Sequence, residues 1–206
     1  MFARFMSNFR KPRGFVGRLV VGMMNKGHAP MTRAVVERLD IAPEDVVLDI
    51  GCGGGEAVRL MAAKAGLVIG IDISDVSVRK SLAVNRLAVE SGRVSISLSS
   101  VLDMPFPRES FTLATAFETV YFWEDIQECF SRVYSALKPG GRFAITVEAW
   151  KGADGGNNFP KIFSSLNPNL YSEEELRVLL TGAGFARTTL VRSDSAKWLC
   201  VVGWKE

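Results

Sequence analysis

The sequence of 206 residues lacks most of the features that mark secreted, membrane-spanning or metal-binding proteins. Its three cysteines, Cys52, Cys129 and Cys200, are too few and too widely spaced for a disulfide framework or a metal-binding motif. No apolar run reaches the roughly 18–20 residues that span a bilayer, and basic residues interrupt the N-terminal apolar stretch, so we expect no secretory signal. These absences predict a cytoplasmic protein without a transmembrane segment and without a metal site.

Acidic residues are missing from residues 1–36, which contain seven Lys and Arg side chains. The net charge of the chain is +3, so the remainder carries −4. A basic arm of this kind can bind nucleic acid, but the acidic body disfavours it, and we do not expect a nucleic-acid partner.

Four apolar residues near the N-terminus have the spacing of one helix face, namely Phe2, Phe5, Met6 and Phe9. Two further short helices are predicted over residues 15–25, ended by Gly27, and over residues 32–39. We expect residues 1–29 to form a lid over a binding site. The same segment could instead recruit an apolar substrate, rest on anionic lipid as a peripheral membrane contact, or form a dimer contact, so both a monomer and a homodimer are compatible with the sequence.

Beyond residue 45, segments typical of strands alternate with segments typical of helices. The predicted strands are residues 46–50, 67–71, 94–98, 111–117, 142–147, 185–191 and 198–204. The predicted helices are residues 56–65, 74–90, 124–137 and 172–181. The last two strands are about six residues apart, too close for a parallel crossover, and therefore form an antiparallel hairpin. We predict an α/β fold: a Rossmann-like, doubly wound sheet of seven strands, mostly parallel, with a C-terminal antiparallel hairpin.

A glycine-rich stretch, "VVLDIGCGGGEA" at residues 46–57, follows the first predicted strand. It is not a P-loop, because no Gly-Lys-Ser/Thr follows. A dinucleotide fingerprint would require glycine at the position of Glu56, and this carboxylate would repel a pyrophosphate at the helix N-terminus. The remaining pattern is Asp-x-Gly-x-Gly-x-Gly, made by Asp49, Gly51, Gly53 and Gly55. It suits a ligand that places no phosphate in the loop.

At this stretch the sequence resembles a known family: "VLDIGCGGG" is similar to motif I of class I S-adenosylmethionine-dependent methyltransferases, and in particular of their small-molecule, bacterial type-11-like members. Further segments with the family's order and spacing are Asp72, "VLDMPFPRESF" at 101–111, "LKPGG" at 137–141 and "YSEEELRVLLTGAGF" at 171–185. "MMNKGHAP" at 23–30 resembles the entry segment of some members more loosely. The resemblance implies a methyltransferase domain over residues 30–206.

The resemblance also implies S-adenosyl-L-methionine as the cofactor. The implied cofactor-binding residues are Asp49, Gly51, Cys52, Gly53, Gly55, Asp72, Ile73, Ser100, Val101, Leu102 and Phe117. Asp72 stands where the family places an acid on the ribose hydroxyls, and a carboxylate can accept from both. Ser100 stands where the family often has an acid for the adenine amino group. It could accept the same hydrogen bond, while the Val101 amide donates to the ring.

Methyl transfer is an in-line displacement, and much of its acceleration can come from alignment. A base is needed only for a poorly ionised hydroxyl or a protonated amine. The segment "FETVYFWED", residues 117–125, follows the fourth strand, so we take Glu118 and Tyr121 as catalytic base candidates. Its aromatic residues either wall the acceptor pocket or pack in the core. His28, the only histidine, lies in a predicted break between helices and is either a lid residue that acts as base or an ordinary surface histidine.

The expected partner is a small-molecule methyl acceptor with an apolar or aromatic portion. No Asn-Pro-Pro-Tyr-type motif follows the fourth strand, and no additional domain is available to hold a protein or RNA. Three alternatives stay open: a tRNA or rRNA methyltransferase that uses the basic arm, a cofactor-binding module without catalysis, and a dinucleotide-dependent oxidoreductase.

Overall fold

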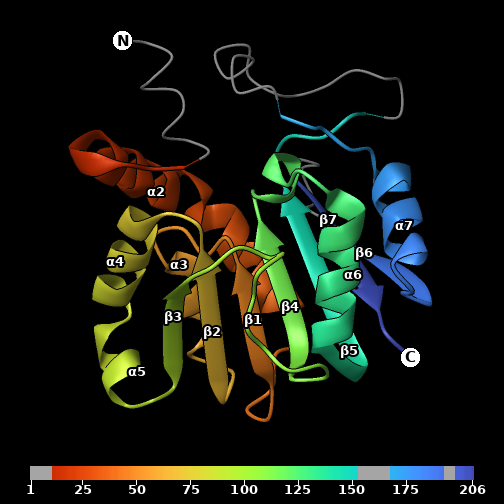
Figure 1. Cartoon of the computed structure of the whole chain (residues 1–206), viewed down its shortest axis with the longest axis horizontal. Helices are drawn as coiled ribbons and strands as arrows, with labels where there is room; N and C mark the ends of the chain where they lie inside the picture. The colour runs from red at the N-terminus through yellow and green to blue at the C-terminus, as the bar shows by residue number, and fades with distance from the viewer. Residues whose placement is uncertain (1–10, 153–167, 193–197) are drawn as a thin grey trace. The chain divides into compact units, whose positions relative to one another are not determined.

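Seven strands form one mixed sheet in the order β3-β2-β1-β4-β5-β7-β6 (Figure 1). The computed structural model describes three ranges of the chain, residues 11–152, 168–192 and 198–206. The chain divides into two units, Met1–Ser100 and Val101–Glu206. The strand order and directions confirm the predicted doubly wound α/β fold.

The first unit contains three parallel strands, β1 (Val46–Ile50), β2 (Leu67–Asp72) and β3 (Val94–Leu98). The register aligns Ile50 with Ile71, so the carboxyl ends of β1 and β2 meet at one edge of the sheet. The predicted first and third strands are confirmed to the residue. Strand β2 is one residue longer than predicted because Asp72 still pairs with Leu98.

Three short helices connect these strands: α3 (Glu56–Met61), α4 (Asp75–Val84) and α5 (Arg86–Glu90). The single helix predicted over residues 74–90 was wrong, since Asn85 separates α4 from α5. The Asn85 side chain donates to the carbonyl of Gly55 as well as to that of Ser81, and a tertiary partner of this kind outweighs local helix propensity.

The N-terminal helix α2 (Gly14–Arg38) is continuous where two helices were predicted. Pro30 lies inside it, and an internal proline costs about 3 kcal/mol through a lost hydrogen bond and a steric clash. One face of α2 is buried, through Val20, Val21, Met31, Val35 and Val36, and the helix packs on α3 and α4. Burial of a large apolar side chain contributes about 1.5–3 kcal/mol, so this face more than offsets the proline. His28 therefore lies within a helix and not in a break.

The second unit contributes β4 (Phe111–Phe117), β5 (Leu137–Val147), β6 (Arg187–Arg192) and β7 (Leu199–Trp204). Strands β4 and β5 are parallel, whereas β7 pairs antiparallel with both β5 and β6. The predicted terminal hairpin is confirmed. Its turn, residues 193–197, lies outside the described residues, as does the predicted N-terminal helix face at residues 2–9.

The helices of the second unit are the 3-10 turn η1 (Val120–Phe122), α6 (Ile126–Ala136) and α7 (Glu173–Gly182). Ser172 caps α7 in a reciprocal capping box with Glu175. An aromatic cluster fills the core beside α6, formed by Trp123, Phe130, Tyr134, Phe143 and Phe185.

Within the described ranges, no helix has both the length and the hydrophobicity that a membrane span requires.

Candidate cofactor-binding and catalytic residues

The glycine-rich loop lies at the carboxyl end of β1 and leads into α3. Gly51, Gly53 and Gly55 have φ values of +75°, +52° and +84°. This left-handed region is accessible to glycine at little cost, so the alternating glycines of the motif are conformational requirements. The Gly51 and Cys52 amides both donate to the Ile71 carbonyl, at 2.8 and 3.0 Å, which fastens the loop to the end of β2.

Asp72 joins this loop to the next one. Its Oδ2 accepts from the Gly53 amide at 2.9 Å, and its Oδ1 accepts from the Ser74 amide at 2.8 Å. Burial raises the pKa of the Asp72 carboxyl, although the hydrogen bonds from Ser74 and Gly53 act in the opposite direction. The Ser77 side chain and the Ile73 backbone also interact with this carboxyl, so four groups of the protein already share its roughly four acceptor positions. Ile73, the next residue, is 42% exposed and places an apolar side chain beside this carboxylate.

Cys52 is a structural residue of the loop. Its thiol is buried, and a Cβ on Gly70 would lie 3.1 Å from the Cys52 Cβ and Sγ. Burial, reinforced by the negative charges of Asp49 and Asp72, raises the pKa of the Cys52 thiol well above its ordinary value. The thiol is therefore neutral. Its carbonyl accepts from the Gly55 amide at 2.9 Å, so Cys52 closes a turn of the loop.

Two residues that sequence reasoning missed support the same loop from α4. Asn85 is buried and donates to the Gly55 carbonyl at 3.0 Å. A Cβ on Gly55 would lie 2.4 Å from Ser81 Oγ and 2.8 Å from Ser81 Cα. Gly55 is thus required both by its backbone angle and by the close approach of α4.

The N-terminal segment also contacts this edge of the first unit. A Cβ on Gly54 would lie 2.3 Å from Asn25 Nδ2, so the Asn25 side chain of α2 lies directly on the loop. The Ser74 hydroxyl donates to the Pro12 carbonyl at 2.7 Å, and both residues are buried. These two contacts fix the N-terminal segment beside the glycine loop and Asp72. His28, half-buried on α2, accepts through its carbonyl from the Thr32 hydroxyl at 2.9 Å.

The residues predicted to contact the adenine ring follow β3. The Ser99 amide donates to the Asp72 carbonyl at 3.1 Å, which brings the chain after β3 to the end of β2. Ser100 is half-buried and its carbonyl accepts from the Ser99 hydroxyl at 3.2 Å. In the second unit, Val101 is buried, Leu102 is half-buried and Asp103 is exposed.

Glu118 is the centre of a polar cluster in the second unit. It follows the half-buried Phe117 at the end of β4 and adopts a φ of +59°, which is uncommon for a residue with a side chain. The Tyr121 hydroxyl donates to Glu118 Oε2, and the Glu148 amide donates to Glu118 Oε1. The Glu118 amide in turn donates to the Thr146 carbonyl at 2.9 Å. A strained backbone held by several hydrogen bonds is a feature that concentrates at functional sites.

Tyr121 is a donor within this cluster. Burial, together with the charges of Glu118 and Glu148, raises the pKa of the Tyr121 phenol well above its ordinary value. A phenol in this state stays protonated and is a poor base. Tyr121 instead orients the Glu118 carboxylate.

Two roles were predicted for the aromatic residues after Phe117, either to wall the acceptor pocket or to pack in the core. The Trp123 ring stacks on Phe143 at a centroid distance of 6.4 Å and meets Phe130 edge-on at 6.0 Å, so it belongs to the core. Phe122 packs edge-on against Tyr121 at 5.0 Å and is only half-buried. Phe122 and Phe117 therefore stay candidates for a ligand contact.

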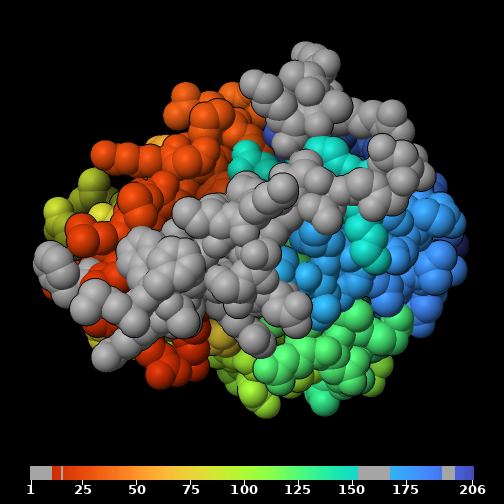
Figure 2. Space-filling view, turned by 90° about the horizontal axis from the view of Figure 1, so that it is seen from above, coloured from red at the N-terminus to blue at the C-terminus, as the bar shows by residue number. Residues whose placement is uncertain are grey.

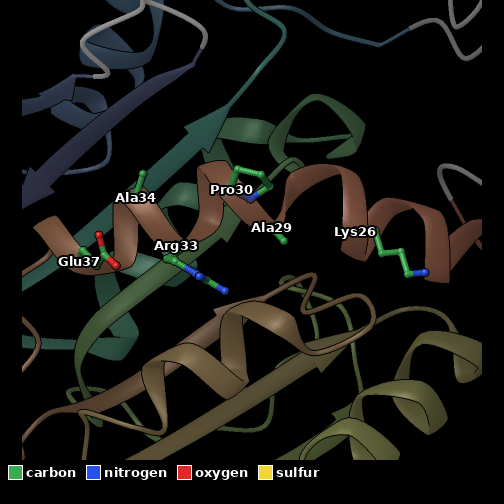
Figure 3. Close-up of a pocket in the computed structure, with 6 residues that line it drawn as sticks. All are labelled: Lys26, Ala29, Pro30, Arg33, Ala34 and Glu37. Atoms are coloured by element: carbon green, nitrogen blue, oxygen red, sulfur yellow. The ribbon is translucent and has the colours of Figure 1, made fainter.

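A surface hollow of about 450 Å³ runs along the second half of α2. The described residues that line it lie on one face of the helix, namely Lys26, Ala29, Pro30, Arg33, Ala34 and Glu37. Figure 3 shows Lys26 and Arg33 projecting from the same side of α2. The hollow thus presents two cations and the carboxylate of Glu37.

Comparisons with known proteins find methyltransferases. A family model described as "Methyltransferase domain" matches residues 48–145, which run from β1 through most of β5. O-methyltransferase resE of Aspergillus sclerotiorum is 32% identical over 160 residues, which cover 75% of this chain and 60% of that protein. The chain belongs to the class I S-adenosylmethionine-dependent methyltransferase family.

Other similar methyltransferases act at different atoms according to their names. The 24-methylenesterol C-methyltransferase 2 of Oryza sativa subsp. japonica is 34% identical over 173 residues, which cover 78% of this chain and 47% of that protein. The structure of Haemonchus contortus phosphoethanolamine N-methyltransferase 2 in complex with S-adenosyl-L-methionine has a TM-score of 0.77 at 19% identity. The match covers 100% of this chain and 60% of that one. This methyltransferase chain therefore spans about half to 60% of the length of these relatives.

Proposed function

We propose that this methyltransferase transfers the methyl group of S-adenosyl-L-methionine to a small, partly apolar acceptor. The observation that carries the proposal is the glycine loop held against Asp72. The left-handed Gly51 and Gly53, both half-buried, lie in the loop at the carboxyl end of β1, whereas Gly55 is buried at the start of α3. Asp72 holds the Gly53 amide from the neighbouring strand. Ligands of doubly wound sheets bind at this edge.

The residues present fit this cofactor. The loop backbone suits the methionine part, because side chains at its glycines would block a close approach. Asp72, at the end of β2, is the proposed acceptor for the two ribose hydroxyls, and the exposed Ile73 side chain suits one face of the adenine ring. Ser100 and Val101 are the proposed polar contacts of the ring. When bound, the cofactor supplies an electrophilic methyl group on a sulfonium.

Glu118 is the proposed base for an acceptor whose attacking atom carries a proton. The Glu118 carboxylate would take the proton of the attacking atom as that atom bonds to the methyl carbon. The methyl–sulfur bond would break in the same step, with the thioether S-adenosylhomocysteine as the leaving group. Tyr121 and the Glu148 amide hold the two carboxylate oxygens, so the orientation is fixed before the acceptor binds. His28 stays a second candidate, with residues 1–29 as a lid. The boundary at residue 29 falls within the continuous helix α2.

The apolar character of the acceptor is supported by the half-buried Phe117 and Phe122 and by relatives named for sterol methylation. An oxidoreductase that binds a dinucleotide is disfavoured by Glu56 at the first position of α3. Its carboxylate is ion-paired with Arg59 at 2.7 Å and occupies the helix end where a pyrophosphate would bind.

Incubation with methyl-labelled cofactor and a fractionated metabolite extract tests the proposed function. We expect label in a small product from an apolar fraction, identified by mass spectrometry. Label in RNA instead of a small molecule would contradict the assignment of the acceptor class, and no labelled product in any fraction would contradict the proposed activity.

Asp72→Ala is expected to weaken binding of S-adenosylhomocysteine about 100-fold or more, because two hydrogen bonds to a charged group contribute about 1.5–3 kcal/mol each. Isothermal titration calorimetry measures the change. Asp75→Ala is the matched control, since Asp75 is an exposed acid three residues on that pairs with Arg79. Unchanged affinity in Asp72→Ala would overturn the assignment of Asp72 to the ribose.

A further inference from the structure

The first turns of α2 expose three large apolar side chains. Val16, Leu19 and Met23 are 41%, 57% and 53% exposed. Their spacing of three and four residues places them on one face of the helix. The adjacent residues Val20 and Val21 are buried, so α2 has one face that packs on the first unit and another that presents apolar side chains to solvent. Clustered apolar exposure of this kind marks an interaction surface.

Exposed basic side chains lie before, within and after this apolar stretch of the chain. Lys11, Arg18, Lys26 and Arg33 are all exposed, and no acidic residue precedes Glu37 in the chain. Among the residues that the structure describes, none forms an ion pair with any of these four cations. Figure 2 shows the red and orange surface of α2 open to the viewer over part of its length. The face is therefore both apolar and strongly positive.

We propose that this face of α2 docks on an anionic lipid bilayer. Apolar side chains flanked by Lys and Arg are the pattern of helices that lie in a membrane interface, where the apolar groups enter the acyl boundary and the cations meet headgroup phosphates or carboxylates.

Charge complementarity favours a lipid bilayer over a second copy of the chain, and the apolar side chains favour it over a nucleic acid. A symmetric contact between two copies would set the same cations against each other. A nucleic acid would satisfy the cations but leave Val16, Leu19 and Met23 without an apolar environment. Docking does not require methyl transfer. Its use, which is to take an apolar acceptor directly from the bilayer, rests on the proposed function.

The test is co-sedimentation of the full chain with lipid vesicles. We expect binding to vesicles containing roughly one third phosphatidylserine, weaker binding to phosphatidylcholine alone, and a decline as salt is raised. The double variant Leu19→Glu, Met23→Glu should lose vesicle binding by about tenfold or more. The matched control is Leu87→Glu, Val178→Glu, which changes side chains that are 71% and 61% exposed elsewhere on the molecule and should bind like the wild type. Circular dichroism checks that both variants are folded.

Three results would overturn the proposal: no binding of the wild type to anionic vesicles, equal losses in the two double variants, or full binding by Leu19→Glu, Met23→Glu. A dimer in sedimentation velocity that dissociates in this variant, without vesicle binding, would assign the face to a second copy. RNA binding without vesicle binding would assign it to nucleic acid. Calorimetry with S-adenosylhomocysteine separates the two proposals, because vesicle binding without cofactor binding leaves docking intact and removes the proposed function.

Discussion

Glu118→Gln is expected to lower the turnover number about 10²–10⁴-fold, the range that a positioned general base contributes. The amide keeps the size of the side chain but cannot take up a proton at neutral pH. Because Glu118 makes no proposed contact with the cofactor, affinity for S-adenosylhomocysteine should change little. The labelled-product assay measures turnover, and calorimetry measures affinity.

Two companion variants sharpen this result. Tyr121→Phe should cause a smaller loss of turnover, because the Glu148 amide still holds one carboxylate oxygen of Glu118. Glu124→Gln, at an exposed acid six residues along the chain, is the matched control and should be fully active. If Glu118→Gln turns over as fast as the wild type, Glu118 is not the base.

Gly55→Ala is expected to destabilise the protein by about 2–5 kcal/mol. This is the sum of two costs, that of holding alanine in a left-handed backbone conformation and that of an overpacked contact. The added Cβ would lie 2.4 Å from Ser81 Oγ and 2.8 Å from Ser81 Cα, and φ at this position is +84°. The loop would have to move to relieve the clash, so cofactor binding should fall as well. Urea denaturation measures the free energy of unfolding.

Gly92→Ala is the control that isolates the contact from the backbone strain. Gly92 has a φ of +75°, but a Cβ there would meet no atom within 4 Å. Its cost should therefore be about 1–2 kcal/mol from the backbone alone. Equal losses of stability in the two variants would show that the approach of α4 to the loop contributes nothing.

The alternation of strands and helices was predictable because each buried strand is a short apolar run bounded by glycine or polar residues. The predicted strand at residues 111–117 is confirmed for that reason, since the signal lies in neighbouring residues. The continuous α2 was not predictable from local signals. Pro30 and Gly27 oppose a helix locally, and only the burial of α2 against α3 and α4 stabilises it.

The residues of the candidate site also divide into those with a local sequence signal and those that depend on tertiary contacts. The glycine pattern and Asp72 were identifiable because a backbone with positive φ restricts the residue type at fixed spacing. Asn85 and Asn25 were missed because each reaches the loop from a residue about 30 positions away in the sequence, and no local pattern encodes such a contact. The raised pKa of Tyr121 depends on burial, which the sequence does not give directly.

Calorimetric titration of the wild-type chain with S-adenosylhomocysteine and, separately, with NADH tests the central claim most directly. If the loop after β1 and Asp72 hold a nucleoside with an amino-acid tail, S-adenosylhomocysteine binds at one site per chain and NADH gives no binding heat. An absence of S-adenosylhomocysteine binding, or equal binding of NADH, would contradict the account.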